Sequence, residues 1–111
     1  MSSTVISKMN TCSKISRVTV TLREDGDLDV KIVSDCPHIQ EYAEKLTKIT
    51  AEDAVDFSKS KIQDPIIRAS VSAPCLTPNA VFDAAWMELG MLSKSLVKKV
   101  ENNNLDFIHN E

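Results

Sequence analysis

The fold is decided by residues 16–32, which read SRVTVTLREDGDLDVKI. Apolar and polar residues alternate on both sides of an acidic stretch that contains Gly26, and this alternation is typical of half-buried strands. A three-residue loop with Gly26 in the left-handed conformation would pair Leu22 with Leu28. A two-residue loop would pair Leu22 with Asp29 and set an apolar face against a polar one. We therefore predict an antiparallel hairpin in the first register.

Helical patterns follow this hairpin along the chain. Residues 36–49 begin with Cys-Pro, which is typical of a helix start, and continue as an apolar stripe. Residues 50–53 resemble the N-cap of a second helix, and residues 77–100 predict one long final helix. Residues 67–73 favour extended chain, and residues 105–107 suggest a last short strand. The expected architecture is α+β: a small antiparallel sheet, made of the N-terminal hairpin plus one or two short strands, packed on one face by two or three helices, the last one long.

Length and composition are those of one domain. A chain of 111 residues can form a core without disulfides. Residues 1–11 are rich in Ser and Thr with little periodicity, so we expect a flexible tail there and a single α+β domain over residues 12–111. The net charge of −3, with both signs interleaved, argues against a nucleic-acid partner. No apolar run approaches the ~18 residues of a membrane span. An odd cysteine count without a signal-peptide pattern predicts a cytoplasmic protein.

Cys12, Cys36 and Cys75 are the side chains with the clearest chemical potential. Cys36 and Cys75 each precede a predicted helix, and thiols at helix N-termini ionise more readily than thiols in a core. The hairpin register, carried onward, brings Cys12 beside Cys36 at the end away from the loop. Zinc and iron–sulfur clusters bind thiolates, but three sulfurs leave a four-coordinate metal one ligand short. His38 is the nearest candidate for the fourth ligand.

Two main interpretations of these residues remain open, beside a minor third in which one cysteine is a reactive redox thiol. In the first, the three cysteines bind zinc or an iron–sulfur cluster, completed by His38, a partner chain or an external ligand. In the second, the cysteines are buried and unreactive, because free cysteine behaves as a small hydrophobe. The protein is then a structural or protein-interaction module, with a homodimer formed through the helix face around Trp86 and Gly90. No pair such as Cys-x-x-Cys and no catalytic motif is present, so the sequence leans away from an enzyme.

The segments VKIVSDCPHI (30–39), RAS (68–70) and PCLTPNA (74–80) resemble a family of small uncharacterised proteins of methanogenic archaea and some anaerobic bacteria. The resemblance lies in a thiol before the first strand, a Ser-Asp-Cys step after the second, and a Pro-Cys-x-x-Pro start to a long helix. It implies that Cys12, Cys36 and Cys75 belong together, which makes the shared thiol site the leading hypothesis. More distantly, residues 18–46 are similar to nitrogen-fixation-type iron–sulfur scaffold domains and to cysteine-bearing domains appended to ribonucleotide reductases. Ile39 stands where the scaffold domains have the second cysteine of a Cys-x-x-Cys pair.

Overall fold

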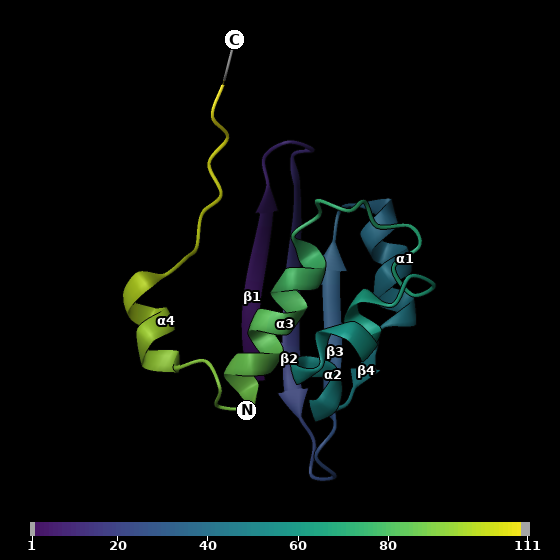
Figure 1. Ribbon diagram of the computed structural model, residues 1–111, viewed down its shortest axis with the longest axis vertical. Coiled ribbons are helices and arrows are strands. Elements are labelled where there is room, and N and C mark those ends of the chain that lie inside the picture. Colours follow the sequence, from purple (N-terminus) through teal and green to yellow (C-terminus); the bar gives the residue numbers. More distant parts are fainter. Residues whose placement is uncertain (1, 110–111) are drawn as a thin grey trace.

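The computed structural model describes residues 2–109 and contains a four-stranded antiparallel sheet in the order β1-β2-β3-β4 (Figure 1). The strands are β1 (Ser2–Met9), β2 (Lys14–Leu22), β3 (Leu28–Ser34) and β4 (Lys48–Ile49). The helices are α1 (Pro37–Lys45), α2 (Ala51–Val55), α3 (Thr77–Glu88) and α4 (Lys94–Val100), and two 3-10 turns, η1 (Phe57–Lys59) and η2 (Lys61–Gln63), follow α2. The predicted α+β class is confirmed.

The β2–β3 hairpin has the predicted register. Leu22 pairs with Leu28, and Val20 pairs with Val30. Gly26 has a φ of 90°, which lies in the left-handed region that the three-residue loop requires and that glycine adopts without strain. The alternation of apolar and polar residues was therefore sufficient to fix both the strands and their pairing.

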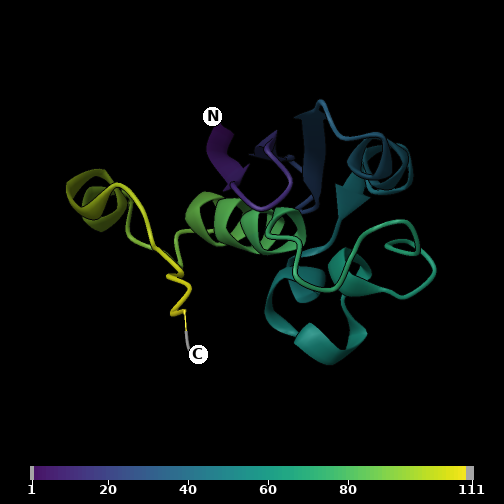
Figure 2. The same ribbon diagram turned by 90° about the horizontal axis from the view of Figure 1, so that it is seen from above.

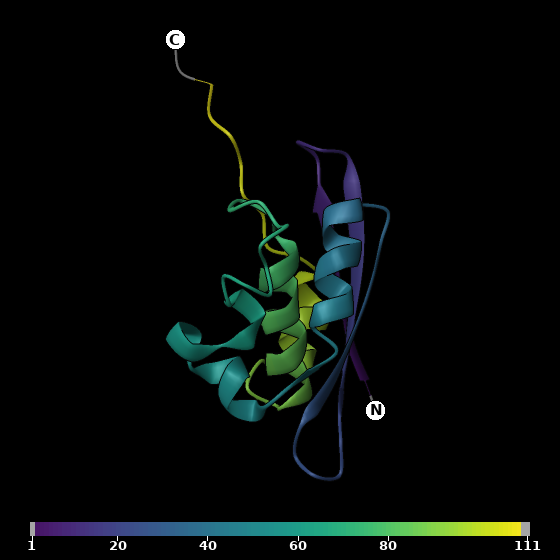
Figure 3. The same ribbon diagram turned by 90° about the vertical axis from the view of Figure 1, so that its right-hand side faces the viewer.

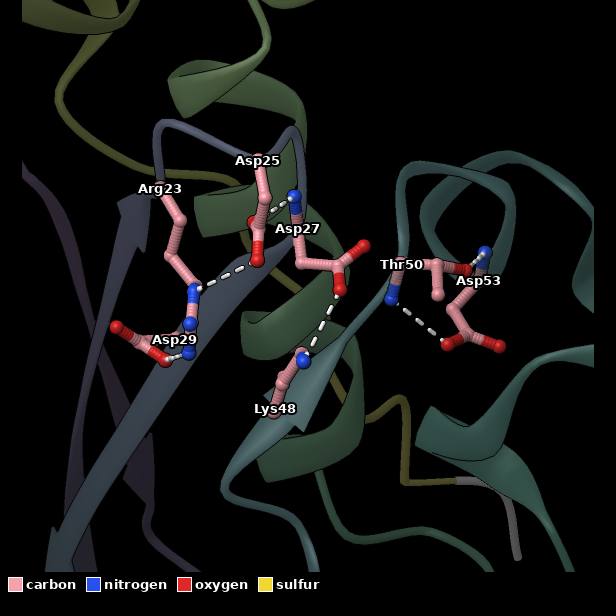
Figure 4. A network of polar contacts seen from close by, with 7 residues as sticks. All are labelled: Arg23, Asp25, Asp27, Asp29, Lys48, Thr50 and Asp53. Carbon is pink, nitrogen blue, oxygen red and sulfur yellow. Dashed lines mark hydrogen bonds and ion pairs between the residues drawn. The ribbon is translucent and has the colours of Figure 1, made fainter.

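Ion pairs and a helix cap organise the chain around this hairpin loop (Figure 4). The Arg23 guanidinium lies 3.4 Å from the Asp25 carboxylate and 3.2 Å from that of Asp29. Beyond β4, the Thr50 hydroxyl accepts the Asp53 N–H at 3.1 Å, and the Asp53 carboxylate accepts the Thr50 N–H at 2.9 Å. This reciprocal capping box starts α2 at the predicted N-cap. The exposed ion pairs of Arg23 contribute little to the stability of the fold, whereas an N-cap stabilises its helix by about 0.5–2 kcal/mol.

Strand β1 replaces the flexible tail that we expected over residues 1–11. Its eight residues pair with β2 without interruption, so they belong to the domain. Ser3 and Ser7 point toward the helices and are only 2% and 5% exposed, with the half-buried Val5 between them. Small hydroxyl side chains at inward positions hid the alternation in the sequence, because serine is usually a surface residue.

Residues 77–100 form two helices instead of the single long helix that we predicted. α3 ends where Gly90 takes a φ of 77°. The Gly90 N–H donates to the Met87 carbonyl at 3.1 Å, and the Met91 N–H donates to the Trp86 carbonyl at 2.9 Å. These two bonds form a Schellman cap, which favours glycine at this position. A Cβ at Gly90 would meet no atom of the chain within 4 Å, so within the chain the role of Gly90 is to end α3.

Two weaker expectations were also wrong. Residues 67–73 form turns instead of extended chain, and residues 105–107 lie outside regular structure. Both segments have apolar residues at alternating positions, but within residues 2–109 neither is paired with a strand of the sheet. Alternation alone does not make a strand where the fold offers no pairing partner.

The hydrophobic core lies between the sheet and the helices. α3 lies against β1 and β2, and α2 with the 3-10 turns lies on the other side of α3 (Figures 2 and 3). The alanines on α3 allow it to approach the sheet closely, while Tyr42 of α1 and Ile62 of η2 fill the space beside β3. The buried apolar residues are Val18, Val20, Leu28, Val30, Ile39, Tyr42, Leu46, Ile49, Ala54, Ile62, Val71, Ala80, Val81, Ala84 and Ala85.

Glu88 ties the end of α3 to the sheet. Its side chain is only 4% exposed, and its carboxylate accepts the Ser3 hydroxyl and the Leu22 N–H, each at 2.9 Å. The Lys94 ammonium lies 3.7 Å away at the start of α4. Burial by itself raises the pKa of Glu88. The two hydrogen bonds and Lys94 favour the charged form, however, and together they lower this pKa below its usual value.

We expect Glu88→Gln to lower the free energy of unfolding by about 1–3 kcal/mol at neutral pH, because an amide cannot accept both hydrogen bonds. Since the folded-state pKa is lowered, this contribution is complete above the unfolded-state pKa of about 4.3 and is lost as the pH falls through the folded-state value. Urea unfolding of both proteins at a series of pH values tests this. The stability difference should shrink on acidification, and a difference independent of pH would contradict this role of Glu88.

Candidate functional site

The three cysteine-bearing segments lie at one end of the molecule. The β1–β2 turn and the N-terminal ends of α1 and α3 are all at the end of the sheet opposite the β2–β3 loop (Figure 1). Cys12 is exposed in the turn, because β2 begins only at Lys14, so it does not lie in the strand beside Cys36 as the register suggested. Cys36 and Cys75 are partly buried and pack against the core.

The predicted metal ligands do not form a cluster in this structure. Within residues 2–109, no three Cys, His, Asp or Glu side chains come together in an arrangement that could hold a metal ion. His38 is exposed in the first turn of α1, and its carbonyl accepts the Ser70 hydroxyl at 2.8 Å. Cys36 is the N-cap residue of α1, as predicted, but its sulfur makes no capping hydrogen bond. The fold brings the cysteine-bearing segments to one end without assembling a ligand set.

The Ser-Asp-Cys step has a structural role at the end of the β2–β3 hairpin. The Ser34 hydroxyl donates to the Ile15 carbonyl at 3.0 Å and accepts the Cys36 N–H at 3.1 Å. The Asp35 carboxylate accepts the Ile15 N–H, also at 3.1 Å. These bonds join the two strands where their regular pairing ends, and they set the direction in which α1 begins. A motif that suggested thiol chemistry is thus explained by closure of the hairpin.

A chain of buried hydroxyls continues from this hairpin to α3. The Thr77 hydroxyl donates to Ser16 at 3.0 Å, and Ser16 donates to Ser34 at 3.0 Å. Thr77 and Ser16 are 1% and 3% exposed. Each hydroxyl donates to the next, and the last one, Ser34, donates to the Ile15 carbonyl. All three hydroxyl protons are therefore hydrogen-bonded within the protein. This chain of hydroxyls fixes the start of α3 against the sheet.

Cys75 lies near the buried hydroxyl of Tyr42, which donates to the Ile62 carbonyl. Burial raises the pKa of Tyr42 well above its usual value; the nearby Arg68 guanidinium opposes this rise, and Cys75 adds to it. Arg68 also donates to the Ser72 carbonyl at 3.0 Å, which holds the loop before α3. Tyr42 therefore stays protonated and serves as a hydrogen-bond donor that joins α1 to η2.

A second candidate surface is an apolar groove between α2, η1 and α3, of which the sequence indicated only the face around Trp86. Phe57 is 64% exposed at its edge and stacks on Phe82, with ring centroids 5.6 Å apart. The Trp86 indole donates to the Ala54 carbonyl at 2.7 Å, so it holds α2 against α3 while 39% of it stays exposed. The groove has a volume of about 300 Å³ and is lined by Ala54, Val55, Phe57, Asn79, Phe82, Asp83, Trp86 and Leu92.

Asp83 supplies the ionisable group among these lining residues. Burial in the groove raises the pKa of its carboxyl, and Asn79 lies 3.4 Å away as a weak hydrogen-bond donor. A carboxylate in an apolar surrounding gains most from a cation. The apolar stripe of residues 77–100 is wider than one sheet contact needs, which was the sequence signal for this surface. The sequence could not show that Phe57 would lie opposite it.

We expect the three thiols to differ in accessibility. Cys12 is exposed, whereas Cys36 and Cys75 are partly buried, so a bulky aromatic disulfide reagent should modify one thiol quickly in the folded protein and two slowly. In protein unfolded by urea, the three thiols should react with the reagent at the same rate. Peptide mass mapping of the labelled protein identifies the fast site. Rapid labelling of Cys36 or Cys75 in the folded state would show that the loop before α3 or the start of α1 opens readily.

Comparison with known protein families matches residues 3–100 to a family of unknown function, DUF6951. Neither the curated proteins nor the solved structures contain a match. Among residues 2–109, none of the helices has the length and apolar character needed to span a bilayer. The matched residues include the whole sheet from Ser3 onward, the three cysteines and every residue that lines the groove. The chain therefore belongs to the DUF6951 family, whose function is unknown.

Proposed function

We propose that this protein is an interaction module that binds an apolar segment of a partner protein in the groove between α2, η1 and α3. The observation that carries this proposal is the exposed Phe57 ring stacked on Phe82 at the mouth of the groove. An aromatic side chain that leaves 64% of its surface in water gains little from folding, but it can bury that surface against a partner. Aromatic residues are enriched at the centres of protein interfaces for this reason.

Asp83 suggests the chemistry of the bound segment. Its carboxylate lies in the apolar groove with a raised pKa and a weak contact to Asn79. A Lys or Arg beside the apolar residues of a partner would satisfy this carboxylate, and such complementary charges give an interface its specificity. We therefore infer that the groove selects a short apolar segment that carries one basic residue.

Selection from a library of displayed peptides tests the proposal. We expect the enriched peptides to combine apolar residues with Lys or Arg. Binding should change the fluorescence of Trp86, which is the only tryptophan of the chain and lines the groove. Phe57→Ala should weaken binding at least tenfold without loss of folding, because Phe57 is exposed and outside the core. Asp83→Asn should reduce the preference for basic peptides.

Phe107→Ala is the matched control, since Phe107 is also an exposed phenylalanine but does not line the groove. It should leave peptide binding unchanged. Enriched peptides that bind without changing the Trp86 emission, or that bind Phe57→Ala as tightly as the native protein, would rule out the groove as the binding surface.

A second candidate function is the binding of zinc or an iron–sulfur cluster through Cys12, Cys36 and Cys75, with His38. Its support is the position of the three cysteine-bearing segments at one end of the sheet (Figure 1). Because no ligand set is assembled within residues 2–109, a metal would require movement of the exposed β1–β2 turn or ligands from a second molecule. The groove is the better supported site, since the residues that line it already lie together in the fold.

Metal analysis of protein purified without oxygen tests this second function. If it holds, we expect close to one metal ion or cluster per chain, lost when the three cysteines are replaced by serine. The His38→Ala variant should then bind more weakly if His38 is a ligand. Metal-free protein, or a metal content that survives replacement of the cysteines, would exclude the thiol site.

A further inference from the structure

Helix α4 lacks the packing that a short helix needs. It has seven residues, Lys94–Val100, and none of them is buried. Isolated helices shorter than about 12–15 residues are marginal in water, and in proteins such helices are stabilised mainly by burial of an apolar face. α4 stands apart from the rest of the molecule, on the β1 side of α3 (Figures 1 and 2). It therefore requires a further surface against which it can pack.

The sequence of α4 gives this helix one apolar face with a cation beside it. Leu96, Val97 and Val100 lie at positions i, i+1 and i+4, so they form a single stripe. Leu96 is 51% exposed and Val100 is 52% exposed. Lys99 follows Leu96 by three residues and borders this stripe, whereas Lys98 lies on the opposite face of the helix. Neither lysine has an ion-pair partner among residues 2–109.

The groove between α2, η1 and α3 has the length and the chemistry to accept such a helix. α3 lines it from Asn79 to Trp86, which is about 10 Å along the helix axis, and α4 is also about 10 Å long. Asp83 lies within this stretch. The lining residues belong to helices, a 3-10 turn and the segment after α3, so they offer no strand edge. An extended segment would leave its backbone groups unpaired against these apolar side chains, whereas a helix pairs them internally.

The contacts at the start of α4 hold it away from the groove of its own chain. The Schellman cap at Gly90 turns the chain after α3, and the Lys94 ammonium lies 3.7 Å from the Glu88 carboxylate. Glu88 is bound to Ser3 and to the Leu22 backbone, on the sheet side of α3. Packing of α4 in its own groove would draw Lys94 away from Glu88. The α4 of another copy can enter the groove without this loss.

We propose that two copies of the chain form a homodimer in which α4 of each copy packs in the groove of the other. This inference rests on the proposed function, because it names the apolar segment that the groove binds. Leu96 and Val100 cover the apolar wall of the groove, and Lys99 pairs with Asp83 of the second copy. α4 and α2 lie on opposite flanks of α3 (Figures 1 and 2), so a two-fold axis along the outward face of α3 brings each α4 to the groove of the other copy.

Sedimentation velocity of the full chain across the micromolar range tests the dimer. We expect a concentration-dependent dimer whose dissociation constant rises at least tenfold in Leu96→Ser, because each dimer loses two buried leucine side chains. Where both proteins are monomeric, the variant should unfold at the same temperature as the native chain, since Leu96 lies outside the core. Leu105→Ser is the matched control, because Leu105 is an exposed leucine outside α4 and the groove, and it should change neither quantity.

Charge substitutions test the pairing of Lys99 with Asp83. Lys99→Glu should raise the dissociation constant roughly tenfold, and addition of Asp83→Lys should restore most of the lost affinity, because the two charges then exchange places. Lys98→Glu changes the net charge equally on the opposite face of α4, so it should leave the affinity close to native. Equal effects of the two lysine variants would contradict the proposed orientation of α4.

Cross-linking between two variants shows which chain supplies α4. In a background with serine at the three native cysteine positions, one protein carries Val100→Cys on α4 and the other carries Val55→Cys in the groove. A short bismaleimide reagent should link the two proteins after mixing. Ser72→Cys, on the exposed loop before α3, should give no linked product in place of Val55→Cys.

A monomer at all concentrations, a dimer unaffected by Leu96→Ser, or absence of the mixed product would overturn the homodimer. Selected peptides that bind the groove of such a monomer would show that the proposed function holds without it. Tighter peptide binding by a monomeric Leu96→Ser variant would show that α4 covers the groove of its own chain, which would also overturn the homodimer. If the homodimer exists, the selected peptides should dissociate it, because they compete with α4 for the groove.

Discussion

The structure depends on the attachment of α3 to the sheet at both of its ends. At the start of the helix, the Thr77 hydroxyl bonds to Ser16 of β2. At its end, the Glu88 carboxylate accepts hydrogen bonds from Ser3 and from the Leu22 backbone. Alanines between these points bring the helix close to β1 and β2. Because Thr77 and the Glu88 side chain are buried, another placement of α3 would leave a buried hydroxyl and a buried carboxylate without these partners, at considerable cost.

The groove between α2, η1 and α3 follows from this placement of α3. Its sheet-facing side is covered, so Phe82 and Trp86 on its other side are left to meet α2 and η1, which are too short to cover them fully.

The cysteines show how a motif can have a structural explanation. Ser34 and Asp35 hold the end of the hairpin through bonds to Ile15, and they place Cys36 at the start of α1 as a consequence. Cys75 lies beside Tyr42 in a half-buried position. The residues around these two thiols are thus required by packing and hairpin closure.

Local patterns in the sequence determined the β2–β3 register, the left-handed Gly26, the N-caps at Cys36 and Thr50 and the α+β class, because each depends on neighbours within a few residues or on strict alternation. Only the tertiary structure decided that Ser3 and Ser7 are buried, that residues 77–100 break at Gly90, and that Phe57 stacks on Phe82. These outcomes depend on contacts between segments far apart in the chain. A serine shows no sign in the sequence of the helix that will cover it, and a glycine within an apolar stripe ends a helix only where the fold turns the chain away.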